Sequence, residues 1–255
     1  MTAPLLEARN VCKRFGHVEA LSDADFTAYS GEVVALVGDN GAGKSTLVKV
    51  LSGVLVPDRG SITFDGQTVQ LTSPLSARQI GIETVYQDLA VAGELGTVEN
   101  IYMGREMLRS GWLGRLGFLD KEAMRLNVAQ VLSRFSVNIQ DTREPVASLS
   151  GGQRQSVAIC RSVMWAQRLV FMDEPTAALG VVQTARVLDM IRQARDEGVA
   201  VVLVSHNMQD VLSVADRIEV MRLGRRVAVL RGPDTNLQEL VAAMTAGEML
   251  DHDPS

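Results

Sequence analysis

Short apolar runs alternate with amphipathic segments along most of the chain, and glycine or proline residues separate many of them. Residues 33–37 and 199–205 have the length and the β-branched content of buried strands, whereas residues 181–197 repeat apolar side chains at helical spacing. Strands that alternate with helices are typical of a mainly parallel sheet with helices packed on it. The pattern therefore predicts an α/β fold.

Two earlier stretches show the alternating pattern of strands that bury only one face. Residues 5–15 and 18–29 alternate apolar and polar positions around Gly16, so they predict an antiparallel pair. Beyond an expected turn at residues 57–60, two more short strands are predicted at residues 61–64 and 68–71. Ser73 followed by Pro74 predicts the start of a helix, and a further strand is predicted at residues 82–86.

Residues 90–148 differ in character, and we expect a helical insertion there. Thr97 is the expected cap of a short helical segment, and Asp120 is the expected cap of an amphipathic helix with Met124 and Phe135 on its apolar face. Between them lies a passage rich in Gly and Arg that contains Trp112. We favour a Trp112 ring that covers the core of this helical block over a ring that faces a partner.

The second half of the chain returns to alternating strands and helices. Beyond residue 205 we expect a helix at residues 207–215, a hairpin that turns at Gly224 and a last helix at residues 236–246. The acidic tail, residues 249–255, is expected to be disordered.

Composition narrows the class of protein. The chain has 255 residues, of which 46% are hydrophobic and 22% charged, as in ordinary globular proteins. Its formal net charge of −5 argues against a general affinity for nucleic acid. No apolar run approaches the ~18 residues that cross a bilayer, and the N-terminus lacks a signal-peptide pattern, so we expect a cytosolic chain. Cys12 and Cys160 are expected to be reduced, packed thiols, and the histidines are too scattered for a metal cluster.

The stretch GDNGAGKST directly follows the strand predicted at residues 33–37 and fits the pattern G-x-x-x-x-G-K-[ST]. Glycine is needed where backbone N–H groups curl inward around phosphate oxygens, because a Cβ would block those turns. Lys44 then reaches the β- and γ-phosphates, and Ser45 offers its hydroxyl to Mg²⁺. The simpler alternative is a glycine turn between a strand and a helix. The candidate nucleotide ligands in the loop are Gly38, Asp39, Asn40, Gly41, Ala42, Gly43, Lys44, Ser45 and Thr46.

Polar residues follow other predicted strands: Gln87 after residues 82–86, Asp173 and Glu174 after residues 168–172, and His206 after residues 199–205. Ligands of parallel sheets bind beyond the carboxyl ends of the strands, so these side chains are expected to gather at one edge. There Asp173 would hold Mg²⁺ and Glu174 would polarise an attacking water. Gln87 would contact the metal or the water, and His206 the γ-phosphate. Singly, the acidic pair also suits a helix entry, and a lone histidine is often structural.

An aromatic side chain, Phe15, lies upstream of the loop. It either stacks on a purine ring or packs in the core as an ordinary strand residue, and the residues leave both readings open.

The order of these motifs, with LSGGQ at residues 149–153, resembles the ATP-binding subunit of an ABC transporter over residues 5–230. LSGGQ separates that family from other P-loop ATPases. The resemblance implies ATP and Mg²⁺ as cofactors and a P-loop α/β ATPase core with a mainly parallel sheet, an antiparallel β subdomain and an α-helical subdomain. We expect the core at residues 1–89 and 156–235, the helical subdomain at 90–155, and a C-terminal helix and tail at 236–255.

The resemblance also implies a head-to-tail homodimer. Ser150, Gly151, Gly152 and Gln153 of one copy would close on the γ-phosphate of ATP that is held by the loop of the other copy. A helix N-terminus preceded by small residues is itself an anion site, which suits that role.

Flanking segments resemble a narrower group. TVYQDLAV, TVENIYMGRE and MDEPTAALG are similar to the ATPases of bacterial monosaccharide importers of the ribose, xylose and fructose type, here in single-copy form. This resemblance implies a membrane permease and a periplasmic sugar-binding protein as partners, no nucleic acid, and a peripheral position on the cytoplasmic side of the cell membrane.

The chain departs from the family pattern after DEPT. Most members have an Asp in the segment that crosses the dimer interface, whereas here Ala178 and Leu179 are followed by Gly180. We interpret this as a trait of the subclass that leaves the communication between the two sites open.

The sequence also bears on other classes of ABC ATPase. DNA-maintenance ATPases carry long coiled coils between the two halves of the site, and the about 60 residues between Gln87 and LSGGQ contain no such heptads. A regulatory module without turnover would not need Glu174 and His206. Export remains an alternative within the same chemistry, or transport of another small solute.

Overall fold

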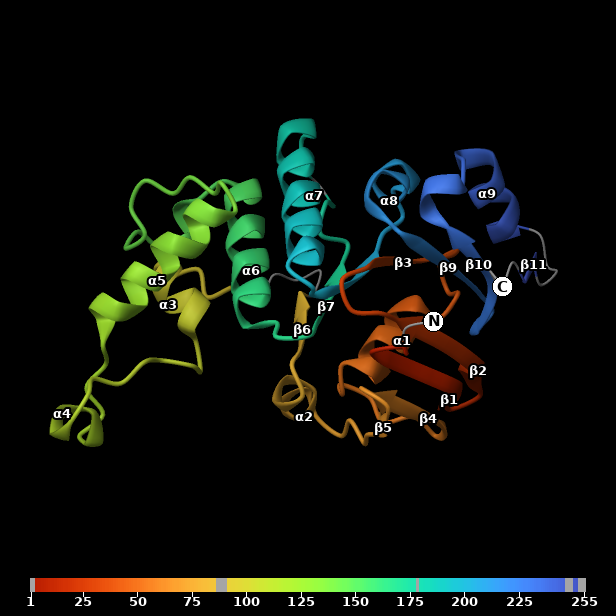
Figure 1. Ribbon diagram of the computed structural model, residues 1–255, viewed down its shortest axis with the longest axis horizontal. Coiled ribbons are helices and arrows are strands. Elements are labelled where there is room, and N and C mark those ends of the chain that lie inside the picture. The colour runs from red at the N-terminus through yellow and green to blue at the C-terminus, as the bar shows by residue number, and fades with distance from the viewer. Residues whose placement is uncertain (1–2, 86–90, 178, 246–249, 252–255) are drawn as a thin grey trace.

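Two β-sheets and a block of helices beside them make up the computed structural model, which describes residues 3–85, 91–177, 179–245 and 250–251 (Figure 1). The larger sheet has the strand order β11-β10-β9-β3-β8-β7-β6. Its strands are β3 (Val33–Val37), β6 (Ile82–Val85), β7 (Leu169–Asp173), β8 (Ala200–Val204), β9 (Arg217–Arg222), β10 (Arg225–Arg231) and β11 (Leu250–Asp251). The neighbouring strands pair in parallel except β9 with β10, which confirms the predicted fold class.

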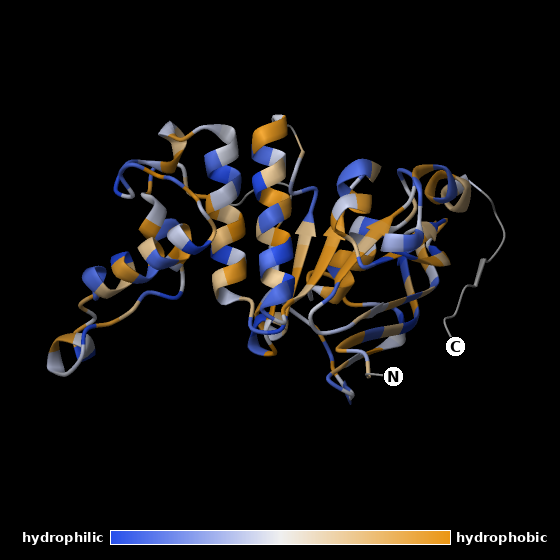
Figure 2. Ribbon diagram, turned by 45° about the horizontal axis from the view of Figure 1, so that its top comes forward, coloured by the Kyte–Doolittle hydropathy of each residue, from blue (hydrophilic) through white to orange (hydrophobic). Residues whose placement is uncertain are grey.

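The central strands of this sheet are buried on both faces. Successive residues of β7 pack into different clusters: Val170 lies with the helices on one face, and Phe171 lies with the smaller sheet on the other. Figure 2 shows these strands in the hydrophobic colour between helices of mixed character. Burial on both faces explains why β3 and β8 are continuous apolar runs and not alternating patterns.

The smaller sheet is antiparallel, with the order β2-β1-β4-β5. It consists of β1 (Leu6–Phe15), β2 (Val18–Ala28), β4 (Arg59–Phe64) and β5 (Gln67–Thr68). Two predictions here are wrong. The expected turn at residues 57–60 includes the start of β4, where Gly60 allows close packing, since an added Cβ would lie 2.6 Å from the Asn10 carbonyl oxygen. The strand expected at residues 68–71 is only the two-residue β5.

Helices cover the faces of the larger sheet. They include α1 (Lys44–Leu51), α2 (Pro74–Gln79), α7 (Val181–Asp196), α8 (Met208–Val214) and α9 (Leu237–Thr245). The prediction for α2 is confirmed: Ser73 accepts a hydrogen bond from the Ser76 N–H, and Pro74 is the first helical residue. The predicted disorder of the tail is wrong for Leu250–Asp251, which pairs with β10 as β11; residues 249 and 252–255 lie outside the described residues.

The helical block contains α3 (Thr97–Tyr102), α4 (Trp112–Arg115), α5 (Lys121–Arg134) and α6 (Gly151–Trp165), with a short 3₁₀ turn at Val146–Ser148. A second 3₁₀ turn, Gly232–Asp234, lies outside this block and follows β10. Asp120 caps α5 as predicted, accepting from the Ala123 N–H. Thr97 is not a cap. It is the first residue of α3, buried, with its N–H donating to the Thr142 carbonyl oxygen.

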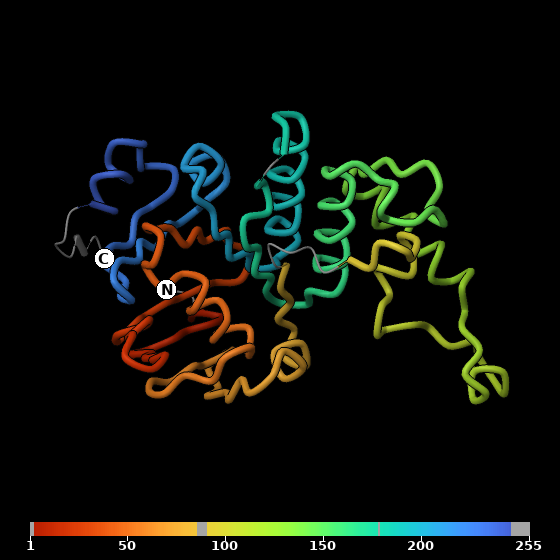
Figure 3. Tube along the Cα trace, turned by 180° about the vertical axis from the view of Figure 1, so that it is seen from behind, coloured from red at the N-terminus to blue at the C-terminus, as the bar shows by residue number. Residues whose placement is uncertain are grey.

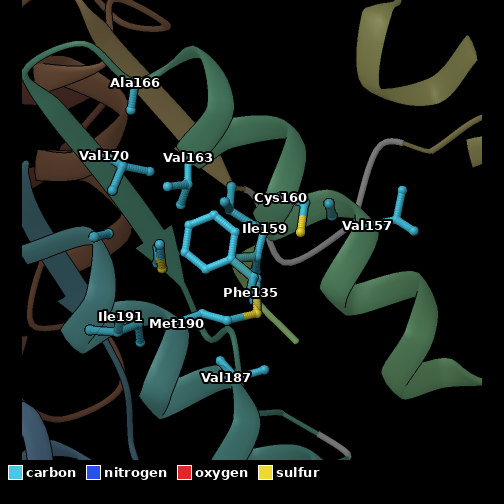
Figure 4. Packing of buried hydrophobic residues seen from close by; sticks show 14 of the residues in the cluster. Phe135, Val157, Ile159, Cys160, Val163, Ala166, Val170, Val187, Met190 and Ile191 are labelled. Atoms are coloured by element: carbon cyan, nitrogen blue, oxygen red, sulfur yellow. The ribbon is translucent and has the colours of Figure 1, made fainter. Parts of the chain in front are cut away.

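The long helix α6 joins the block to the sheet. Figure 4 shows Phe135 packed against Ile159, Cys160 and Met190, which come from α6 and α7. At its far end Trp165 donates from Nε1 to the Ile101 carbonyl oxygen (2.9 Å) and meets the Tyr102 ring edge-on. The predicted boundary between core and helical subdomain, at residue 155, lies inside α6, and the division into subdomains stays a prediction.

Two predictions about single side chains have opposite outcomes. Cys12 and Cys160 are free and buried, as predicted, and burial raises the pKa of Cys160 to about 12. The preferred reading of Trp112 is wrong. Its side chain is 70% exposed on α4, which lies apart from the other elements (Figures 1 and 3), so the ring does not cover the core.

Candidate active site

The loop between β3 and α1 has a shape that only glycine permits at its two ends. Gly38 and Gly43 have φ angles of +147° and +101°. A Cβ on Gly38 would lie 2.1 Å from the Met221 carbonyl oxygen, and one on Gly43 would lie 2.7 Å from the Ala20 carbonyl oxygen. The loop is thus held between β9 and β2, and no side chain caps the helix that follows. Its first N–H groups stay available to an anion.

Lys44 arches back over this loop. Its Nζ donates to the carbonyl oxygens of Gly38 (2.6 Å) and Asp39 (3.0 Å). Burial lowers the pKa of Lys44, while the carboxylates of Glu174, Asp39 and Asp173 act to raise it. The ammonium group therefore lies beside the loop, close enough to Asp173 and Glu174 at the end of β7 for their charges to act on it.

The carboxyl ends of β3, β8 and β7 meet at one edge of the sheet, as predicted, because these strands are adjacent and parallel. Glu174 follows β7 directly, and its N–H donates to the Val204 carbonyl oxygen at the end of β8 (2.9 Å). Its φ of +53° is unusual for a residue other than glycine. Such a conformation, held by a neighbouring strand, fixes the direction of the side chain.

His206 follows β8 and contacts Glu174. Its Nδ1 lies 2.7 Å from Glu174 Oε2, while most of the imidazole is exposed. The sequence placed both residues at this edge but did not predict that they bond to each other. The predicted contact of His206 with a γ-phosphate stays a prediction.

The residues at this edge suit Mg²⁺ only together with phosphate oxygens. No group of three or more His, Cys, Asp or Glu side chains among the described residues could hold a metal ion. Burial, and then the charge of Glu174, raises the pKa of Asp173, against which Lys44 and Lys49 act. A cation would stabilise the charged form of this carboxylate, and the Ser45 hydroxyl is exposed in the first turn of α1. Mg²⁺ commonly binds one or two protein oxygens and completes its shell with phosphates and water, so the two residues fit it.

Two further predictions concern the rim of this site. Gln87 lies outside the described residues, as does Ala178. Phe15 ends β1 beside Gly16 and is 48% exposed, so it is not a core residue. Its exposed ring leaves stacking on a purine as the remaining prediction.

The LSGGQ segment forms the start of α6. Ser150 is the N-cap: its Oγ accepts from the Gln153 N–H (3.3 Å), and its own N–H donates to Gln153 Oε1 (3.0 Å). This reciprocal pair is a capping box. The N–H groups of Gly151 and Gly152, which the first turn of a helix leaves unpaired, stay available to an anion.

A cavity of about 280 Å³ opens beside this helix start. Two of its lining residues, Gln183 and Arg186, belong to α7 and were not predicted as site residues. The Gln183 side chain lies against Gly152, where an added Cβ would be 2.6 Å from Gln183 Cγ. The position of Gln183 was readable in the sequence, because it lies three residues beyond Gly180, where a helix accepts a capping glutamine.

Gly180 is the N-cap of α7, and no side-chain hydrogen bond caps this helix start. The Gln183 Oε1 atom would lie 2.8 Å from a Cβ at Gly180, so the Gln183 side chain reaches both Gly180 and Gly152. The segment that lacks the usual Asp is therefore in contact with the LSGGQ helix through one glutamine.

Within one chain, the loop and LSGGQ stay separate. Figures 1 and 3 show α1 among the elements on one side of α7 and α6 on the other. Among the described residues, no hydrogen bond or ion pair joins residues 38–46 to residues 150–153. Each chain thus presents two candidate anion sites that do not meet.

Residues 21–177 match the family model described as ABC transporter. The chain belongs to the ABC transporter family. The match covers the loop, LSGGQ and the acidic strand end, and it confirms the resemblance stated from the sequence.

Relatives in this family align along nearly the whole chain. The fructose import ATP-binding protein FrcA of Rhizobium meliloti is 46% identical over 96% of this chain and 95% of its own length. The xylose/arabinose import ATP-binding protein XylG of Sulfolobus acidocaldarius is 43% identical over 95% and 94%. The ribose import ATP-binding protein RbsA 1 of Rubrobacter xylanophilus is 39% identical over 98% of this chain but 49% of its own length.

Solved structures share the fold. A nucleotide-free ATP-binding cassette from an ABC transporter has a TM-score of 0.81 at 24% identity and covers 98% of both chains. A bacterial ABC transporter cassette solved as a dimer has a TM-score of 0.75 at 20% identity and covers 90% of this chain and all of that one. These structures confirm the predicted ABC ATPase fold, and the family match together with the relatives confirms the ATPase class of the enzyme. The part of the chain that the structure describes contains no helix long and apolar enough to cross a membrane.

Proposed function

We propose that this chain is the energy-coupling ATPase of an importer for a simple sugar, and that two copies bind ATP between them. The observation that carries the proposal is the pair of separate anion sites in one chain, the glycine loop before α1 and the start of α6. A head-to-tail pair of chains brings the loop of one copy to the LSGGQ segment of the other. The sugar is proposed from relatives named for import of fructose, xylose, arabinose and ribose.

The residues of the loop bind and orient the nucleotide. The N–H groups at the start of α1 surround the phosphates, and Lys44 turns from its own loop carbonyls to the β- and γ-phosphates. Phe15, exposed at the end of β1, stacks on the base. Ser45 and Asp173 would hold Mg²⁺, which on binding neutralises charge on the phosphate oxygens. Gln87 is expected to contact the metal or the water.

Glu174 orients and polarises the water that attacks the γ-phosphorus. Its fixed backbone and the bond to His206 aim the carboxylate at the edge where the loop lies. His206 is exposed enough to turn from Glu174 to the γ-phosphate of bound ATP. On the opposite side, Ser150 and the N–H groups of Gly151 and Gly152 of the second copy complete the phosphate shell, and Gln153 holds Ser150 in place.

Closure of the two copies on ATP would move a membrane permease, and hydrolysis would release them. The subunit would lie on the cytoplasmic side of the cell membrane, and a periplasmic protein would deliver the sugar. We propose no nucleic acid partner, in keeping with the net charge of −5.

The dimer is tested with Glu174→Gln, which keeps the shape of the side chain but not its charge. Sedimentation velocity with Mg²⁺ and ATP should show a stable dimer of this variant, whereas the wild-type chain with Mg²⁺ and ADP should stay monomeric. Phosphate release by the variant should fall about 10²- to 10⁴-fold. A strictly monomeric variant with wild-type turnover contradicts the proposal.

The cargo is tested in cells. Replacing the chromosomal copy by Glu174→Gln should abolish uptake of one labelled monosaccharide among fructose, xylose, arabinose and ribose, and leave amino acid uptake unchanged. If amino acid uptake is lost, or if uptake of all four sugars is unchanged, the chain is not a sugar importer subunit. The proposed ATPase activity would stand.

A further inference from the structure

The segment between α3 and α5 projects from the molecule as an arm, defined here as residues 107–119. Its two sides are joined at the base, where the Asp120 N–H donates to the Met107 carbonyl oxygen (2.7 Å) and the Arg109 N–H donates to the Phe118 carbonyl oxygen (2.9 Å). Leu108 and Leu119 form an antiparallel bridge. The arm ends in the single turn of α4, far from the sheets in Figures 1 and 3.

The turn at the tip is closed on itself. Gly114 packs so tightly that an added Cβ would lie 1.9 Å from the Arg109 carbonyl oxygen. The N–H groups of Leu116, Gly117 and Phe118 all donate to carbonyl oxygens within the turn. The tip therefore has a defined shape, and much of its backbone polarity is already satisfied before it meets a partner.

Apolar side chains of the arm are exposed at and below this closed turn. Trp112 is 70% exposed and Leu116 is 65% exposed, and Leu108 and Phe118 are also exposed. Exposed apolar residues scattered singly are ordinary, but four within one projecting arm of 13 residues are typical of an interaction site. Nothing in the fold requires them, because the core of the helical block lies elsewhere.

The charge of the arm is opposite to that of the chain. Its charged residues are Arg109 and Arg115, with no Asp or Glu, whereas the whole chain has a formal net charge of −5. Both arginines are exposed, and neither makes an ion pair within the described residues. Arg115 lies in the turn and Arg109 lies nearer the base of the arm. A positively charged, apolar arm on an acidic protein complements a surface that is both negatively charged and apolar.

We propose that the arm inserts its tip into the headgroup region of a membrane that contains anionic lipids. Trp and Phe side chains favour the boundary between headgroups and acyl chains, and arginines near that boundary are attracted to anionic headgroups. The internal hydrogen bonds of the turn lower the cost of leaving water. The inference deepens the proposed function, on which it rests for the presence of a membrane, and gives the ATPase a lipid contact besides its permease.

The test uses the purified full chain and vesicles without permease. Cosedimentation is measured with phosphatidylcholine vesicles and with vesicles that also contain phosphatidylglycerol. The chain should bind the anionic vesicles, and added salt should weaken binding. Trp112→Ala should weaken it about tenfold or more, and the double variant Arg109→Ala with Arg115→Ala about fivefold for each arginine.

Matched controls change equivalent residues outside the arm. Leu75→Ala removes an apolar side chain that is exposed on α2, and the double variant Arg9→Ala with Arg231→Ala removes two exposed arginines. Both should bind vesicles as the wild-type chain does. Tryptophan emission should shift to the blue on anionic vesicles, and the shift should be absent in Trp112→Leu, which leaves Trp165 as the remaining tryptophan.

Two results overturn the inference: no binding to either kind of vesicle, or binding that the arm variants leave unchanged. ATP hydrolysis in the absence of vesicles should be unchanged by the arm variants. If vesicle binding persists in a chain that proves to have no ATPase activity, the membrane contact stands and the proposed function fails.

Discussion

The two candidate anion sites of this chain are built in different ways. The loop before α1 is preformed: its glycines are wedged against strand backbone, and its lysine is already folded over it. The start of α6 is closed by a neutral capping box, and the cavity beside it is lined in part by two long side chains of α7, Gln183 and Arg186. A preformed site can bind a nucleotide alone, whereas an adjustable one is suited to recognise a nucleotide that another chain presents. The following predictions test that difference.

The largest effect is expected from Lys44→Ala, which removes the only ammonium group that the described structure folds over the loop. Hydrolysis should fall at least about a hundredfold, and ATP binding should weaken in a chain that is still folded. Phosphate release and fluorescent-nucleotide titration measure both. Lys49→Ala, on the exposed side of the same helix, is the control, and an equal loss there would make the effect one of net charge.

The same substitution at the two sites should cost different amounts. Gly38→Ala forces a Cβ against the Met221 carbonyl in a left-handed conformation and should lower the free energy of unfolding by about 3 kcal/mol. Gly152→Ala meets only the Gln183 side chain and should cost about 1 kcal/mol.

Urea unfolding of the single variants and of their combinations with Gln183→Ala measures this contrast. Gln183→Ala should restore the stability of Gly152→Ala and do nothing for Gly38→Ala. Equal costs at both positions, with no rescue, would show that the second site is as rigid as the first.

Ser150 separates the role of a helix cap from that of a phosphate ligand. Ser150→Ala should destabilise the chain by about 1 kcal/mol, and Ser150→Asp, which caps as well as Ser, should keep full stability. Both should lose turnover, the Asp variant because its charge repels the γ-phosphate. Thermal unfolding and phosphate release are measured side by side; full activity of the stable Asp variant would remove Ser150 from the phosphate shell.

The smallest effect concerns Asp173 without nucleotide. Burial and Glu174 raise its pKa above 3.8, so the folded state holds this proton more tightly than the unfolded state does. Stability from this group is present below pH 3.8 and is lost as the pH rises through the raised pKa. At neutral pH, Asp173→Asn should therefore stabilise the empty chain by ~1 kcal/mol or less after solvent screening, while it removes activity with Mg²⁺. Melting temperatures across pH 3 to 8, in steps of about one unit, test the sign; a destabilised variant at neutral pH would refute it.

Local rules fixed much of this architecture in advance. The glycine pattern, the apolar strands and the caps at Ser73 and Asp120 depend on neighbours in the sequence, and the structure has them where predicted. The errors depend on neighbours in space. Gly60 was predicted to lie in a turn, but glycine is needed there because β1 packs closely against it. That tertiary contact is not visible along the sequence. Thr97 looked like a cap, but the preceding Gly96 takes that place.

In the candidate site, too, the sequence predicts features that depend on the order of motifs and misses contacts between distant segments. The motifs point to Lys44, Asp173 and Ser150 as candidate residues. The bond between His206 and Glu174 joins two strand ends and could not be seen along the chain. Gln183 touches Gly152 across two helices. Trp112 was assigned to the core on its residue type, although a single turn at the end of an arm has no core to join.

The helix α6 has a mechanical consequence. It runs without interruption for 15 residues, a length of about 22 Å. At one end is Ser150, and at the other Trp165 is tied to Ile101 and lies under the Arg105 guanidinium, two residues before the arm. Arg105 in turn bonds to the buried Glu83 of β6. Because a helix transmits displacement along its axis, a shift of α6 at Ser150 would also displace the base of the arm and the edge strand β6.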